Sequence, residues 1–128
     1  LDDAERMFRK ELSMHDDLTC MKNLAEILIG KDSLVEAELW LNRSLKVWPD
    51  DPAAKNDLAA VFGKRGDYAG AVRLWEEAVE LDPDLISAYK NLVFGYALMH
   101  DEAKAIEWQQ RLAKKGVNVE IPKVDSSK

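Results

Sequence analysis

The feature that most constrains this chain is a repeat with a period of 34 residues that runs through nearly all of it. Positions that are 34 residues apart carry the same kind of residue: a leucine at one position, an alanine at a second and a large apolar residue at a third. These positions are Leu24, Leu58 and Leu92; Ala37, Ala71 and Ala105; and Leu28, Phe62 and Tyr96. Periods of roughly 20 to 50 residues are typical of chains in which one supersecondary unit stacks on the next. The sequence therefore predicts a row of similar units.

The middle unit is predicted to form two helices joined by a tight turn. Apolar residues spaced three and four apart between Ala54 and Phe62 indicate the first helix. Gly66 stands where a left-handed turn residue is needed, and Asp67 is placed to cap the next helix. The second helix is expected to run to about Leu81.

This pattern resembles the tetratricopeptide repeat family, whose 34-residue unit carries small and large apolar residues on its first helix, an alanine on its second and a proline near its end. The resemblance implies an all-α fold, a right-handed superhelix of antiparallel helix pairs with about seven helices. It places complete units at 18–51, 52–85 and 86–119. Residues 1–17, with Ala4 and Phe8 in the equivalent places, correspond to the second helix of a preceding partial unit. The first residue is Leu1 rather than Met, so a piece of a longer protein is expected.

The third unit departs from the pattern at its second helix. Gln109 stands where the middle unit has Trp75, and Val117 replaces the terminal proline. A more polar outer helix is typical of a repeat that caps a solenoid. Residues 120–128 are expected to form an extended or disordered tail, because Pro122 interrupts a segment too short for a full helix.

Composition excludes several classes of function. The net charge of −6 argues against nucleic-acid and membrane-surface binding, which need a basic surface. No apolar run approaches the roughly 20 residues that span a bilayer. The single cysteine, Cys20, excludes an internal disulfide or a multi-cysteine zinc site and fits a reducing, cytoplasmic location.

No residue pattern predicts catalysis, a metal or a cofactor. The pairs His15-Asp16 and His100-Asp101 and the RGD sequence at 65–67 fall between helices, where turn and capping roles account for them. The four tryptophans are interpreted mainly as core residues. This part of the chain is therefore predicted not to be an enzyme, and the activity of any longer parent stays open.

The family geometry implies a concave face lined by the first helix of each unit. Its inward residues are predicted to be Thr19, Lys22, Asn23, Glu26, Asn56, Asp57, Ala60, Lys64, Ser87, Lys90, Asn91 and Phe94. The amides of Asn23 and Asn91 can bond a peptide backbone without requiring a particular sequence, and the three lysines can meet acidic groups.

The leading hypothesis is a non-catalytic scaffold that holds a peptide or a partner's helix on this face. The alternative is an accessory domain of a larger enzyme, used for docking or for positioning a substrate. Self-association through the helical ends is a further hypothesis. The clamp with which some family members hold the carboxylates of chaperone tails is not expected, because Glu26 and Asp57 would repel such a ligand.

Overall fold

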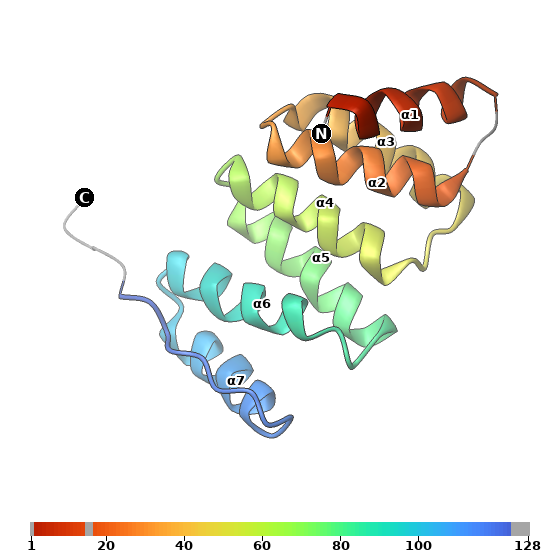
Figure 1. Ribbon diagram of the computed structural model, residues 1–128. Helices are drawn as coiled ribbons and strands as arrows, with labels where there is room; N and C mark the ends of the chain where they lie inside the picture. Colours follow the sequence, from red (N-terminus) through yellow and green to blue (C-terminus); the bar gives the residue numbers. More distant parts are fainter. Residues whose placement is uncertain (1, 15–16, 124–128) are drawn as a thin grey trace.

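The computed structural model describes residues 2–14 and 17–123 of the chain. Within these residues the chain forms seven α-helices and no strand (Figure 1). The helices are α1 (Asp2–Met14), α2 (Leu18–Gly30), α3 (Leu34–Val47), α4 (Pro52–Lys64), α5 (Tyr68–Leu81), α6 (Ile86–Leu98) and α7 (Glu102–Ala113). The predicted all-α class and helix number are confirmed.

The same turn joins α2 to α3, α4 to α5 and α6 to α7. Asp32, Gly66 and His100 have positive φ angles of 60°, 84° and 61°, and they stand 34 residues apart. In each turn the backbone N–H of the next residue donates to a carbonyl five residues upstream, at 2.8 to 2.9 Å. This is the six-residue hydrogen bond of a Schellman ending, which reverses the chain within a few residues. The left-handed conformation predicted at Gly66 is confirmed.

Aspartates begin four of the helices. Asp17, Asp51, Asp67 and Asp101 each accept a hydrogen bond from a backbone N–H in the first turn of the helix that follows, at 3.0 to 3.2 Å. A side chain at this position satisfies a donor that has no partner inside the helix. The capping role predicted for Asp67 is therefore confirmed.

Small residues allow the helices to pack closely. Ala37, Ala71 and Ala105 are fully buried. A β-carbon added to Gly95 of α6 would lie 2.8 Å from Val72 Cγ1 and 3.2 Å from Trp75 Cζ3, both on α5. Because atoms cannot approach so closely without strain, Gly95 is required where α5 crosses α6.

The core is continuous along the row of helices. One cluster of buried side chains spans α2 to α4, and a second spans α4 to α7. Phe62 of α4 and Leu74 of α5 pack against both clusters and join them. The stacking of one unit on the next therefore buries an uninterrupted apolar interior, as expected for a solenoid.

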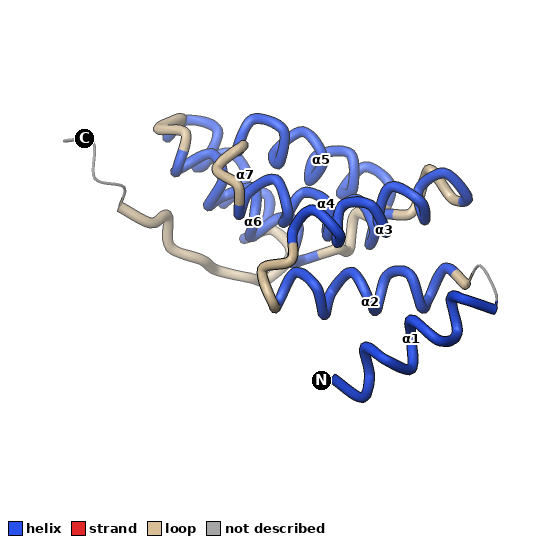
Figure 2. Tube along the Cα trace, turned by 90° about the horizontal axis from the view of Figure 1, so that it is seen from above, coloured by secondary structure: helices blue, strands red, loops and turns tan. Residues whose placement is uncertain are grey.

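The helices lie in chain order, and each contacts the next (Figures 1 and 2). Polar contacts, described below, join the even-numbered helices α2, α4 and α6. We call the surface formed by these three helices the even-helix face. The odd-numbered helices lie on the other side, where Arg9 of α1 binds Glu36 of α3 through two hydrogen bonds of 2.6 and 3.0 Å.

The segment after α7 lies against the end of the row. Val117, Val119 and Ile121 pack on the second core cluster, and Gln109 Nε2 donates to the Val119 carbonyl at 2.9 Å. Gln109 occupies the repeat position that holds Trp75 in the middle unit, and its side chain donates the hydrogen bond that holds the segment after α7. Residues 124–128 lie outside the described residues, and the division into three units stays a prediction.

The burial of Trp75 generates a stability prediction. Its side chain is 6% exposed and lies between α4 and α6, whereas Trp48 is 46% exposed. Trp75→Ala is expected to lower the free energy of unfolding by about 3–5 kcal/mol, because it leaves a large cavity. Trp48→Ala is the matched control and is expected to cost less than about 1 kcal/mol. Chemical denaturation measures both, and equal losses would contradict the assigned packing.

Candidate interaction surfaces

The structure places every predicted inward residue on α2, α4 or α6. Thr19, Glu26, Lys64, Ser87, Lys90 and Phe94 are exposed, and Lys22, Asn23, Asn56, Asp57, Ala60 and Asn91 are half-buried. None of them belongs to the fully buried core.

Polar contacts join neighbouring helices at the centre of this face. Asn56 Nδ2 of α4 donates to Ser87 Oγ of α6 at 3.3 Å, and Asp57 of α4 shares a hydrogen bond with Glu26 of α2. Lys22 Nζ of α2 lies 2.8 Å from Oδ2 of Asp51, the buried residue that caps α4. The structure therefore brings together predicted residues from α2, α4 and α6.

Two of the three predicted lysines are engaged by acids of the chain itself. Lys22 binds Asp51 and also lies 5.5 Å from the centre of the Trp48 ring. Lys64 Nζ lies 3.5 Å from Asp32 Oδ1. Lys90, which is exposed, forms no ion pair with a described residue. Sequence reasoning had assigned all three to acidic groups of a partner and did not foresee these internal pairs.

Asp57 has an unusual protonation equilibrium. Burial, followed by the charge and the hydrogen bond of the neighbouring Glu26, raises the pKa of Asp57 to about 7, while Lys22 acts in the opposite sense. The proton allows Asp57 to donate to Glu26. The equivalent positions in the other two units carry Asn23 and Asn91, whose amides can donate at any pH.

The centre of the face also holds an acceptor without a donor. Asn56 Oδ1 is buried and has no hydrogen-bond partner among the described residues. A buried acceptor left without a donor costs about 1–3 kcal/mol. A bound molecule that supplied N–H groups here would remove that cost after a small rotation of the half-buried side chains.

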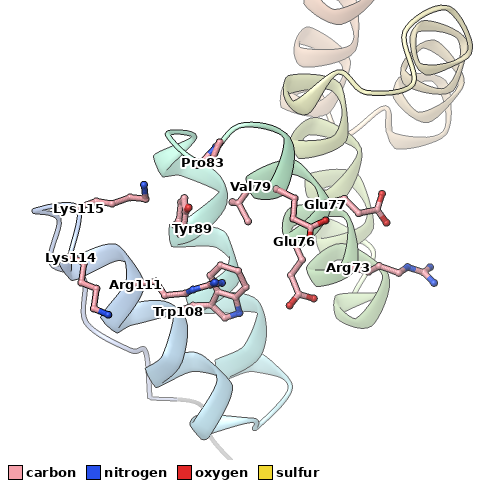
Figure 3. A pocket seen from close by; sticks show the side chains of 11 residues that line it. Arg73, Glu76, Glu77, Val79, Pro83, Tyr89, Trp108, Arg111, Lys114 and Lys115 are labelled. Atoms are coloured by element: carbon pink, nitrogen blue, oxygen red, sulfur yellow. The ribbon is translucent and has the colours of Figure 1, made fainter.

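A second surface, not foreseen from the sequence, is a groove of about 900 Å³ between α5 and α7, which we call the outer groove (Figure 3). Tyr89 of α6 and Trp108 of α7 form its floor, edge to face, with ring centres 5.8 Å apart. The Arg111 guanidinium carbon lies 4.4 Å from the centre of the Trp108 ring, and Lys115 Nζ lies 5.3 Å from that of Tyr89. Cations are thus stacked on both aromatic rings.

The two walls of the outer groove differ in charge. Arg111 and Lys114 stand on the α7 side, and Glu76, Glu77 and Glu80 stand on the α5 side. Arg73 also belongs to α5, but its side chain points away from α7 (Figure 3).

Two of the α5 carboxylates already have partners. Glu77 binds Lys55 at 2.7 Å. Glu76 accepts a hydrogen bond from Tyr96, and burial, followed by the charge of Glu76, raises the pKa of Tyr96 to about 12. Among the described residues, Glu80 and Lys114 form no ion pair. The groove therefore presents an open acid and an open base on opposite walls.

A sequence signal for the outer groove existed. Trp108 and Arg111 repeat the spacing of Trp40 and Arg43, two units upstream, where the guanidinium carbon lies 5.0 Å from the centre of the Trp40 ring. The interpretation of the tryptophans as core residues holds for Trp75 and Trp108, at 6% and 5% exposure, but is wrong for Trp48, at 46%. The pairing of Trp40 and Trp108 with arginine was not predicted.

The remaining motifs fall at turns and helix ends of the described residues. Residues 2–14 and 17–123 contain no group of three His, Cys, Asp or Glu side chains that could hold a metal ion. Asp101 caps α7 and His100 is a turn residue, whereas the pair His15-Asp16 lies outside the described residues. No helix of the described chain has the length and apolar character needed to cross a membrane.

Comparison with solved structures identifies the architecture. A crystal structure of MamA superposes with a TM-score of 0.83, at 18% identity over 90% of this chain and 68% of that one. MamA from residue 41 onward, from Desulfovibrio magneticus RS-1, gives 0.81 at 19% identity over 88% and 64% of the two chains. YrrB, described as a TPR protein with an unusual peptide-binding site, gives 0.75 at 21% identity over 86% and 57%.

The chain has a tetratricopeptide-repeat fold. The expected resemblance is thus confirmed at the level of fold. No family model matches the sequence, and no curated protein does. The chain spans 64% of the Desulfovibrio structure and 57% of YrrB, less than two thirds of either.

The raised pKa of Asp57 predicts a pH-dependent stability. The folded chain holds this proton up to about pH 7, whereas an aspartate in an unfolded chain has a pKa near 3.8. Between these values the folded state binds more protons, so the stability that the protonated group confers falls as the pH rises. Asp57→Asn, which keeps a donor toward Glu26, is expected to raise the free energy of unfolding at about pH 8 by about 1–3 kcal/mol and to have little effect near pH 4.

Denaturant titrations across this pH range measure the effect. Asp50→Asn, at an exposed loop position, is the matched control and should leave the pH profile unchanged. Parallel stability curves for wild type and Asp57→Asn would show that Asp57 does not hold the proton.

Proposed function

We propose that this tetratricopeptide-repeat domain is a non-catalytic interaction scaffold that binds an extended peptide or a partner's helix on its even-helix face. The observation that carries the proposal is the row of Asn23, Asp57 and Asn91, one from each unit, beside the unsatisfied acceptor Asn56 Oδ1. Side chains that both donate and accept can bond successive backbone groups of a ligand. The peptide-binding site described for YrrB, which has the same fold, supports this assignment.

The electrostatics of the face favour a ligand with a basic side chain near its middle. Glu26 is exposed and shares its hydrogen bond with Asp57, while the cations Lys22 and Lys64 are occupied by Asp51 and Asp32. A lysine or arginine beside Glu26 would favour the ionised form of Asp57 and form a charge-assisted hydrogen bond. A cytoplasmic location, inferred from cysteine usage, stays a prediction.

The row of amides can be tested directly. Peptides selected on the wild-type protein from a random library should lose at least about tenfold in affinity for the Asn23→Ala/Asn91→Ala variant, because each truncation removes one donor and one acceptor. Asn42→Ala, an exposed asparagine on α3, is the matched control and should bind as wild type. Calorimetric titration gives the affinities. Equal binding by wild type and the double variant would exclude the even-helix face.

The internal pairing of Lys22 also predicts what does not bind. An acidic C-terminal peptide of the chaperone-tail type is expected to show no micromolar affinity, because Asp51 occupies Lys22 and Glu26 and Asp57 stand where further cations would be needed. Fluorescence anisotropy with a labelled peptide makes the measurement. Micromolar binding that Lys22→Ala abolishes would overturn this prediction.

A further inference from the structure

The outer groove leaves a specific arrangement of chemistry open to a partner. Glu80 stands on its α5 wall, Lys114 and the stacked Arg111 stand on its α7 wall, and aromatic rings form the floor between them. An occupant that complements it needs a basic edge, an apolar centre and an acidic edge, in that order across its width.

The exposed face of α1 has this arrangement. Phe8 and Leu12 turn toward the core, which leaves Arg6 with its partner Asp3, and Met7, Lys10 and Glu11, on the opposite side of the helix. With 3.6 residues per turn, Arg6 and Lys10 fall along one edge of this side, Met7 near its middle and Glu11 on the other edge. The Met7 residue is 62% exposed and the Arg6 side chain 79% exposed. The pairing of Arg6 with Asp3 is a surface contact that costs little to exchange.

We propose that α1 of one copy of this chain docks in the outer groove of a second copy. In this contact Arg6 lies against Glu80, Met7 covers the aromatic floor beside Tyr89 and Trp108, and Glu11 meets Lys114 and Arg111. The contact joins two different surfaces of the chain, so it is heterologous.

The occupant comes from another copy because α1 cannot reach the groove of its own chain. Helix α1 is held at one end of the row by Arg9 with Glu36 and by Lys31 with Glu5, and the groove lies between α5 and α7 near the other end (Figure 1). Two chains of net charge −6 repel each other at long range, but salt screens that repulsion beyond about 8 Å in physiological buffer. The orientation of the contact is then set by the short-range pairing of Arg6 with Glu80 and of Glu11 with Lys114 and Arg111.

A charge-swap experiment tests the contact on the full chain. Sedimentation equilibrium of the wild type should give a weight-average mass that rises above 14.5 kDa with concentration. Glu80→Arg and Arg6→Glu, each alone, place like charges together and should weaken self-association about tenfold or more. The Arg6→Glu/Glu80→Arg double variant restores an opposite pair and should return to within about threefold of wild type.

Asp50→Arg is the matched control for Glu80→Arg, since it makes the same change of charge at an exposed loop residue outside both surfaces, and it should associate as wild type. A wild-type mass of 14.5 kDa at every concentration would overturn the proposal. So would unchanged association of Glu80→Arg, failure of the double variant to recover, or equal weakening by Asp50→Arg. Binding of peptides to the even-helix face does not depend on any of these outcomes.

Discussion

Close packing of neighbouring helices is the constraint on which the rest of this structure depends. Ala37, Ala71 and Ala105 are fully buried at the same place in each unit, and Gly95 has no room for a β-carbon beside Val72. Because the helices approach this closely, large side chains such as Trp75 can bridge one unit to the next. The left-handed residue in each turn supplies the other requirement, since it reverses the chain within the span that the packing allows.

The two surfaces follow from this packing in different ways. The even-numbered helices approach closely enough for side chains of adjacent units to bond one another, as Asn56 does with Ser87, so their face is a connected polar surface. On the other side, Arg9 and Glu36 bridge α1 to α3, whereas no ion pair crosses from α5 to α7 within the described residues. One fold thereby presents a polar row on one side and, on the other, an aromatic groove whose walls carry opposite charges.

The sequence predicted the features that recur with the period and missed those that depend on one unit meeting another. The helix pairs, the cap at Asp67 and the left-handed turn at Gly66 follow from local chemistry and are present. The turns at Asp32 and His100 carry no glycine, and only the period could have revealed them. The engagement of Lys22 by Asp51, and the outer groove, depend on the relative rotation of neighbouring helices, which no short stretch of sequence encodes.

The extension after α7 has a consequence for how this domain opens. Three apolar side chains and a hydrogen bond from Gln109 hold it against α7, without the repeated backbone hydrogen bonds of a helix. Segments with so few stabilising contacts detach locally, and the free energy of this opening is well below that of global unfolding. A fluorophore placed near Val119 would therefore report the release of this segment rather than the melting of the helices, and amide exchange in Val117 to Ile121 would be faster than in α5.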